Sequence, residues 1–267
     1  MTWYEGVFLG FLQGATEFLP VSSSGHLVMG QELLGVEVPG LGFEVALHLA
    51  TLASVLVVYR ARIGALLAGA ARGDPAQLRY GGLLMLASVP AAVAGAGFGD
   101  FLASLFDSPA VTGVALLVTG CVVWTARAAL ARGPAGRPGP GSAVVVGLAQ
   151  AVAVVPGISR SGATVVAALW RGIGVREAAA FSFLLSVPAV GGAALLEVPG
   201  LVGEAGGAPA ADGVSAAVLG VAAAVACVTG VAAIRAFRAM LESGSLHRFA
   251  PYLWTAGALF LWFLGAR

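Results

Sequence analysis

A carboxylate, a histidine and a cluster of hydroxyl groups lie close together near the start of the chain. The set consists of Gln13, Glu17, Ser22, Ser23, Ser24 and His26. Gln13 and Glu17 are four residues apart, so they share one face of a helix. Glu17 could bind a divalent cation, act as a general base or orient His26, and an imidazole serves as acid, base or nucleophile near neutral pH. Serines can also simply cap a helix after Pro20, but a cap does not explain an acid and a histidine together.

A second set of residues has the properties of an anion-binding turn. It consists of Gly157, Ser159, Arg160, Ser161, Gly162 and Thr164. Gly and Ser allow backbone N–H groups to turn inward where a helix begins, and a helix N-terminus attracts anions. Arg160 adds a guanidinium group that can hold two phosphate oxygens at once, and the hydroxyl groups add further donors. Arginines in membrane proteins usually reach to the interface, but the place of Arg160 inside a Ser/Gly turn argues against that alternative.

Together the two sets predict phosphoryl transfer, and the sequence contains no Walker, zinc or dinucleotide-binding motif. The expected catalytic residues are Glu17, Ser23, His26 and Arg160. The expected substrate-binding residues are Gln13, Ser22, Ser24, Gly157, Ser159, Ser161, Gly162 and Thr164. The expected metal ligands are Glu17 and Gln13.

Three routes for the nucleophile are open. Ser23 lies three residues before His26, so Ser23 could attack phosphorus with His26 as its acid/base partner. His26 could attack directly, or His26 or Glu17 could activate a water molecule. We favour the first route because an irregular turn would expose the Ser23 oxygen.

The composition places these residues in a membrane protein. Of the 267 residues, 59% are hydrophobic and 10% are charged, and the mean hydropathy is +0.94. Soluble domains carry roughly 25% charged residues, so most of this surface must face lipid. The formal net charge of +1 gives no electrostatic reason to expect a nucleic-acid partner. Residues 1–5 contain no basic segment, so no cleavable signal peptide is expected.

Six apolar segments are long enough to cross a bilayer, which takes about 20 residues with a range of about 17–25. They are roughly 43–59, 80–98, 109–125, 178–196, 213–234 and 249–265. Two further apolar regions, 7–34 and 143–173, are interrupted by Pro, Gly and Ser at the two sets described above. The sequence therefore predicts an all-α, polytopic membrane protein.

The two interrupted regions resemble each other. Residues that match at one constant offset are Gly10 and Gly147, Gln13 and Gln150, Ser22 and Ser159, Ser24 and Ser161, and Gly25 and Gly162. Each interrupted region is followed by three predicted spans. We therefore expect a single membrane domain built from two repeats, residues 1–130 and 140–267, joined by a linker rich in Arg, Pro and Gly.

Loop charges predict how the repeats are oriented. Cytoplasmic loops collect Arg and Lys, and Arg occurs in the loops after the first, third and fifth spans, whereas 99–108 and 197–212 carry only acidic charges. Both termini are then outside and the linker inside, and three spans per repeat invert the second repeat relative to the first. The two interrupted regions become re-entrant hairpins whose tips meet near mid-membrane, where inverted repeats usually bind their ligand.

Both motifs resemble the signatures of a known family. The first reads Glu-Phe-Leu-Pro-Val-Ser-Ser-Ser-Gly-His from Glu17 to His26, and the second reads Pro-Gly-Ile-Ser-Arg-Ser-Gly-Ala-Thr from Pro156 to Thr164. They are similar to the two signatures of the bacterial undecaprenyl-pyrophosphate phosphatases, or bacitracin-resistance phosphatases. Gln13 with Glu17 resembles the family's Glu/Gln-x-x-x-Glu element, and the similarity runs over nearly the whole chain.

The resemblance implies hydrolysis of undecaprenyl pyrophosphate to the monophosphate carrier of peptidoglycan precursors, with bacitracin resistance. It also implies a divalent cation, Mg²⁺ or Ca²⁺, and a site in the bacterial inner membrane that opens to the outer side. The expected partners are a long-chain polyprenyl pyrophosphate and membrane lipids, and a homodimer is left open. Two positions depart from the family: Ser24 replaces a common Thr, and His48 replaces an expected Gln. His48 is either a second titratable group near the site or a structural histidine.

Two other functions compete with this interpretation. A flippase or transporter of polyprenyl phosphates would share the inverted repeats. A structural membrane protein would not explain Glu17, His26 and Arg160 within apolar segments. Release of inorganic phosphate from a long-chain prenyl pyrophosphate separates these functions, because a transporter moves lipid without releasing phosphate.

Overall fold

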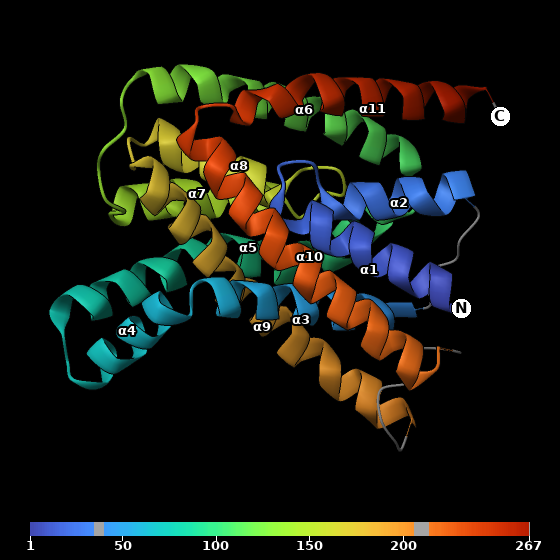
Figure 1. Ribbon diagram of the computed structural model, residues 1–267, viewed down its shortest axis with the longest axis horizontal. Coiled ribbons are helices and arrows are strands. Elements are labelled where there is room, and N and C mark those ends of the chain that lie inside the picture. The colour runs from blue at the N-terminus through green and yellow to red at the C-terminus, as the bar shows by residue number, and fades with distance from the viewer. Residues whose placement is uncertain (35–39, 206–213, 267) are drawn as a thin grey trace.

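The computed structural model describes residues 1–34, 40–205 and 214–266, and the regular structure of these residues is helical (Figure 1). Within the described part of the chain, a single isolated bridge joins Gly136 and Ile173. The helices are α1 Trp3–Phe18, α2 Ser23–Leu34, α3 Gly40–Val58, α4 Arg60–Ala71, α5 Pro75–Phe106, α6 Pro109–Ala131, α7 Pro140–Val152, α8 Arg160–Trp170, α9 Val175–Ala205, α10 Ala216–Glu242, the short 3₁₀ helix η1 Leu246–Arg248, and α11 Phe249–Gly265. The predicted all-α class is confirmed over these ranges.

Among the described residues, four helices are long and apolar enough to cross a membrane. They are α5, α6, α10 and the part of α9 that ends at Leu195. A fifth candidate exists if α3 and α4, which meet at 79°, form one bent span. The last predicted span coincides with α11, whose 17 residues are at the short end of the spanning range. The chain is therefore a multi-pass helical membrane protein.

Two segments differ from their predicted form. The basic stretch after the first predicted span is expected to be a loop, yet it forms α4, because its Ala and Leu residues favour a helix. The predicted span 80–98 ends at Phe98, which has non-helical backbone angles, and α5 continues beyond this kink to Phe106. Gly213, the predicted start of the fifth span, lies outside the described residues.

Each interrupted region forms two helices joined by a turn. α1 runs inward from the end of the molecule where both termini lie, and α2 returns toward that end (Figure 1). Residues 19–22 make the turn between them. In the second region α7 packs against α8, and residues 153–159 make the turn. Both regions are thus broken helices, as the sequence predicts.

Glycines bring the first helix of each broken region close to a helix from the other half of the chain. Small residues let the backbones of membrane helices approach one another. A Cβ atom on Gly10 would lie 2.3 Å from the carbonyl oxygen of Ala222, and one on Gly147 would lie 2.6 Å from that of Ala87. Both positions therefore require glycine, which allows α1 to pack on α10 and α7 to pack on α5.

An aromatic cluster anchors the end of α1 immediately before the first turn. Phe183 of α9 lies edge-on to Phe18 and to Phe237, with ring centroids 5.6 and 5.2 Å apart. All three side chains are fully buried. Helices in lipid associate through packing rather than through removal of apolar surface from water, so this close contact holds Phe18, and with it Glu17, in place.

Candidate active site

The turns of the two broken helices contact each other directly. Ser161 donates its hydroxyl hydrogen to the carbonyl oxygen of Leu19 at 3.0 Å. A Cβ atom on Gly25 would lie 3.2 Å from the Cα of Gly157. Ser22 and Gly157 have φ angles of 69° and 94°. Such a conformation costs a non-glycine residue about 1–3 kcal/mol and persists only where neighbouring contacts hold it, so the junction is tightly specified.

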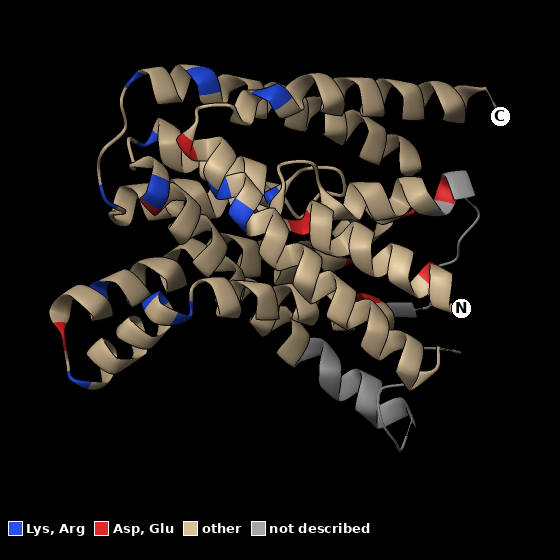
Figure 2. Ribbon diagram, in the orientation of Figure 1, with Lys and Arg blue, Asp and Glu red and all other residues tan. Residues whose placement is uncertain are grey.

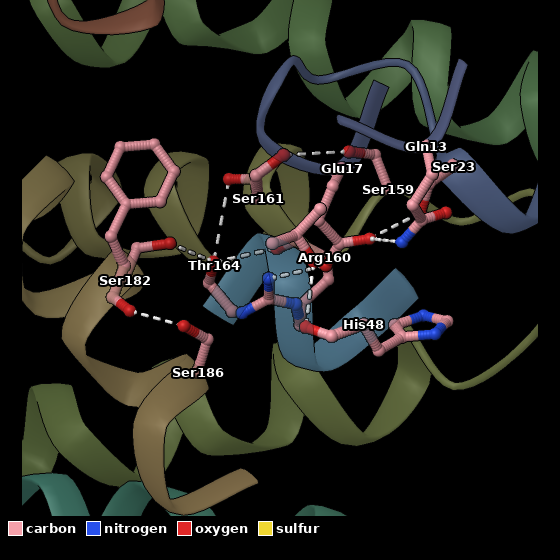
Figure 3. Close-up of polar contacts among 12 residues, drawn as sticks. Gln13, Glu17, Ser23, His48, Ser159, Arg160, Ser161, Thr164, Ser182 and Ser186 are labelled. Carbon is pink, nitrogen blue, oxygen red and sulfur yellow. Dashed lines mark hydrogen bonds and ion pairs between the residues drawn. The ribbon is translucent and has the colours of Figure 1, made fainter. Parts of the chain in front are cut away.

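Glu17 lies at the centre of this junction, as Figure 3 shows. Nη2 of Arg160 donates to its Oε1 at 2.8 Å. The Ser23 hydroxyl donates to Oε2 at 2.6 Å, and Nε2 of Gln13 donates to the same oxygen at 3.2 Å. The Glu17 and Arg160 side chains are 8% and 17% exposed. Since removal of one partner from a buried ion pair typically costs about 3–5 kcal/mol, this pair ties the two broken helices together.

Ser23 and His26 do not form the hydrogen-bonded pair expected from their spacing. Ser23 directs its hydroxyl to Glu17, while Nδ1 of His26 lies 2.8 Å from the carbonyl oxygen of Ser22. Nε2 of His26 lies 2.5 Å from the hydroxyl oxygen of Tyr252. Both ring nitrogens of His26 thus have other partners, and Ser23 contacts the Glu17 carboxylate instead.

The N-terminal end of α8 is held by hydroxyl groups. The Ser159 hydroxyl accepts a hydrogen bond from the N–H of Gly162 at 3.1 Å and lies 3.2 Å from the Ser161 hydroxyl. Thr119 of α6 donates to the carbonyl of Gly157 at 2.8 Å and accepts from the N–H of Ser159 at 3.2 Å. A helix N-terminus favours an anion, and these contacts fix that terminus at the junction.

The remaining predicted hydroxyl groups also have partners within the protein. Thr164 donates to the backbone carbonyl of Arg160 at 2.7 Å, and its hydroxyl lies 2.6 Å from that of Ser182. The Ser22 and Ser24 hydroxyls lie 3.2 Å apart. These groups shape the two turns, and their role as phosphate ligands stays a prediction.

Thr119, Ser182 and Tyr252 contribute to the site but are not identified by sequence reasoning. Each lies in a helix that the apolar pattern marks as an ordinary span, outside the motif that it contacts. Their spacing carries no signal for these contacts. A hydroxyl group within an apolar helix is the sole hint, and many such groups bond only to their own helix.

His48 lies on α3, with Nδ1 2.8 Å from the carbonyl oxygen of Glu44 in the preceding turn. In Figure 3 its imidazole points away from the Arg160 guanidinium. One ring nitrogen is therefore satisfied within α3, and His26 makes the same kind of contact, so the structural alternative also stays a prediction. A role as a second titratable group at the site stays a prediction.

Oxygen atoms beside Glu17 suit a cation that is shared with a substrate. Oε1 of Gln13 is buried and has no hydrogen-bond partner, although Nε2 of the same side chain contacts Glu17. Across the described ranges, no three His, Cys, Asp or Glu side chains come together as a metal cluster. Mg²⁺ is commonly bound by one or two carboxylates together with substrate phosphates. The residues present fit that arrangement.

An apolar groove of about 470 Å³ adjoins the second turn. It is lined by Ala110, Val111, Val114, Ala115, Val118, Val152, Val155 and Ile158. Val155 and Ile158 belong to the second turn, so the groove borders the segment that leads into α8, whose first residue is Arg160. A hydrocarbon chain is the chemistry that such a lining accepts.

These features define a multi-pass membrane protein in which a buried Glu–Arg pair joins two broken helices, a class suited to binding an anionic group within the membrane. The chain belongs to the family described as bacitracin resistance protein BacA, whose family model matches residues 6–259.

Curated relatives cover almost the entire chain. A protein from Desulfatibacillum aliphaticivorans is 41% identical over 98% of both chains. Proteins from Desulfosudis oleivorans and Desulforapulum autotrophicum are 40% and 37% identical over 97% of both chains. All three relatives are named undecaprenyl-diphosphatase.

Proposed function

We propose that this protein hydrolyses undecaprenyl diphosphate to undecaprenyl phosphate and inorganic phosphate, which recycles the lipid carrier for cell-wall synthesis and confers bacitracin resistance. The observation that carries the proposal is the chain of contacts from Ser23 through Glu17 to Arg160. It brings a nucleophile, a base and an anion-binding group together where two broken helices meet. The names of the relatives support the same substrate.

The reaction begins when the terminal phosphate binds at Arg160 and the N-terminus of α8. The phosphate oxygens compete with Glu17 for the guanidinium N–H groups, which frees the carboxylate to take the Ser23 proton. The Ser23 oxygen then bonds to the terminal phosphorus as the bridging P–O bond breaks, and undecaprenyl phosphate leaves. Glu17 passes its proton to the departing undecaprenyl phosphate. It then takes a proton from the water that attacks the phosphoserine and returns it to the Ser23 oxygen as inorganic phosphate leaves.

A divalent cation, Mg²⁺ or Ca²⁺, is part of this proposal. Glu17 and the Oε1 atom of Gln13 would hold it together with substrate oxygens. When bound, the cation neutralises charge on the diphosphate and its leaving group.

The proposed topology is two inverted repeats, 1–130 and 140–267, each with a re-entrant hairpin and three spans. The exchanged packing of α1 on α10 and of α7 on α5 supports it, because equivalent helices contact equivalent partners. Figure 2 supports the orientation, since most Arg residues gather toward one end of the molecule, opposite the termini. We place that end in the cytoplasm of a bacterial inner membrane, with the site open to the outer side.

Cysteine labelling tests this topology. In a chain without Cys121 and Cys227, a membrane-impermeant reagent applied from outside should label Ser104→Cys but not Ala71→Cys or Ala135→Cys. These three positions are exposed. Labelling of all three from outside would refute the inverted arrangement. The homodimer stays a prediction, which the molar mass of the detergent-solubilised protein tests.

We place the prenyl tail of the substrate in the apolar groove between α6 and the second turn. Ile158 in the groove wall and Arg160 in the phosphate-binding turn are two residues apart. A lipid that lies in the groove can therefore present its diphosphate to Arg160 without leaving the membrane.

Purified protein tests the function. The expected result is release of inorganic phosphate from undecaprenyl diphosphate in detergent, and its loss in Glu17→Gln. Vesicles that contain the protein distinguish hydrolysis from the transporter alternative. Movement of the lipid between leaflets without phosphate release would overturn the proposed activity.

A further inference from the structure

His26 is held on both sides by contacts. Its Nδ1 lies 2.8 Å from the carbonyl oxygen of Ser22, and its Nε2 lies 2.5 Å from the hydroxyl oxygen of Tyr252. The His26 and Tyr252 rings are nearly parallel, with an interplanar angle of 13° and centroids 5.8 Å apart. Tyr252 belongs to α11, at the opposite end of the chain from His26.

The chemistry of the two partners determines where the imidazole carries its proton. A backbone carbonyl only accepts hydrogen bonds, so the nitrogen that faces Ser22 must be protonated. In a neutral imidazole the other nitrogen is then an acceptor, and the Tyr252 hydroxyl must donate to it. The Ser22 carbonyl therefore selects the neutral tautomer of His26 that is protonated at Nδ1, and the Tyr252 hydroxyl pairs with Nε2 and holds the ring in that orientation.

The protonated Nδ1 supports a strained turn. Ser22 has a φ of 69°, and its carbonyl oxygen also accepts the backbone N–H of His26 at 3.1 Å. Two donors from one residue thus converge on the Ser22 carbonyl. The next residue is Ser23, whose hydroxyl reaches Glu17 at 2.6 Å. A change in the orientation of the Ser22 carbonyl would therefore move the Ser23 oxygen relative to Glu17.

The Tyr252 contact extends from this buried turn to the surface. His26 is 8% exposed, whereas Tyr252 is 48% exposed. The phenol approaches from outside the pair of broken helices and contacts the imidazole rather than Glu17, Ser23 or Arg160. Its effect on the site must therefore pass through His26.

We propose that Tyr252 is a positioning residue: its hydroxyl pairs with Nε2 and holds the ring orientation in which Nδ1 of His26 meets the Ser22 carbonyl, and His26 in turn fixes the Ser22 turn that directs Ser23 to Glu17. The kinetic consequence rests on the proposed function. The hydrogen-bonded state of His26 does not, so the two can be tested separately.

The kinetic test uses Tyr252→Phe, which keeps the aromatic ring and removes the donor. With purified protein and undecaprenyl diphosphate, kcat should fall about tenfold, the scale of a lost hydrogen bond, while KM changes by less than about twofold. The matched control is Trp262→Phe, an exposed aromatic residue on the same helix. Its kcat and KM should equal those of the unsubstituted protein.

The structural test is ¹⁵N NMR of histidine-labelled protein in detergent. The His26 signals, identified by their loss in His26→Gln, should report a protonated Nδ1 and an unprotonated Nε2. In Tyr252→Phe the Nε2 signal should shift because that nitrogen loses its hydrogen-bond partner, and the Nδ1 signal should shift as the ring moves relative to the Ser22 carbonyl, whereas Trp262→Phe should leave both signals unchanged.

The outcomes separate the inference from the function. Unchanged His26 signals in Tyr252→Phe overturn the inference, whatever happens to kcat. Shifted His26 signals with an unchanged kcat overturn the positioning role. If the unsubstituted protein releases no phosphate, the proposed function fails, and the NMR signals alone then decide whether Tyr252 positions His26.

Discussion

Ser23 donates its hydroxyl hydrogen to Oε2 of Glu17 at 2.6 Å, although the two residues lie on different helices of the first hairpin. The other carboxylate oxygen of Glu17 accepts from Arg160 of the second hairpin at 2.8 Å. One carboxylate thus contacts both the candidate nucleophile and the candidate phosphate ligand. Changes at Glu17 and Arg160 should therefore affect activity and stability in distinguishable ways.

Replacement of Glu17 by Gln should abolish most phosphate release. The amide keeps the shape of the side chain but cannot take the Ser23 proton, and loss of a general base typically lowers the rate by about 10²–10⁴-fold. Phosphate release by purified protein measures the effect. Gln13→Ala should cost less, because the Gln13 amide is neutral and cannot take the Ser23 proton. If Glu17→Gln keeps its activity and its metal dependence, the carboxylate is structural.

Replacement of Arg160 should separate stability from activity. Arg160→Ala leaves the Glu17 carboxylate buried without a partner, so its thermal unfolding temperature should fall. Arg160→Lys keeps the charge and should recover much of that loss. The rate of phosphate release by Arg160→Lys should nevertheless stay low, within about tenfold of the rate of Arg160→Ala. A lysine ammonium group lacks the planar guanidinium that binds two phosphate oxygens at once.

Arg176→Lys is the matched control for Arg160. Arg176 pairs with Glu242 at 3.0 Å, and its side chain is 81% exposed. Exposed ion pairs contribute roughly 0–1 kcal/mol to stability. Neither the thermal unfolding temperature nor the rate of phosphate release should therefore change in Arg176→Lys. Near-normal turnover in Arg160→Lys would show that Arg160 acts through its charge alone.

The sequence predicts the broken helices well because backbone requirements appear directly as residue types. Gly10 and Gly147 mark close helix approaches, and both breaks lie beside the Ser/Gly runs. Ser23 and Arg160, which the sequence places within the turns, are instead the first residues of α2 and α8. The partners of individual side chains are less predictable. The i+3 spacing of Ser23 and His26 permits a contact, but a tyrosine 226 positions away along the chain takes the imidazole nitrogen. The spacing of nearby residues does not show when a distant residue supplies the hydrogen-bond partner instead.

Gln13 should influence the concentration of divalent cation that the enzyme needs. Its Oε1 is buried without a hydrogen-bond partner beside Glu17. Gln13→Glu adds a charged oxygen ligand and should lower the Mg²⁺ or Ca²⁺ concentration for half-maximal rate, while Gln13→Ala should raise it. Phosphate release is measured across a metal titration. If the half-maximal concentration is the same in both variants and in the unsubstituted protein, Gln13 is not a ligand.

Filling the apolar groove should impair long substrates selectively. Val114→Trp places a large ring among the lining residues, so KM for undecaprenyl diphosphate should rise several-fold while KM for a short prenyl diphosphate changes little. Val228→Trp on α10 is the control, since Val228 is 69% exposed and lies away from the groove lining. Equal effects on both chain lengths would place the prenyl tail elsewhere.

The nucleophile should be Ser23, because its hydroxyl is already bonded to a base. Turnover of substrate labelled in the terminal phosphate is quenched in parallel in acid and in alkali. The label should survive the acid quench on Ser23 as an acid-stable, base-labile phosphoserine, and Ser23→Ala should carry none. An acid-labile phosphohistidine at His26 would show instead that the imidazole attacks.

The stereochemistry at phosphorus tests the same assignment when the phosphoenzyme is too short-lived to trap. Two successive displacements through Ser23 retain configuration, whereas direct attack by water inverts it. Inversion in a chirally labelled thiophosphate substrate would therefore rule out Ser23 as the nucleophile and leave Glu17 or His26 as the base that activates water.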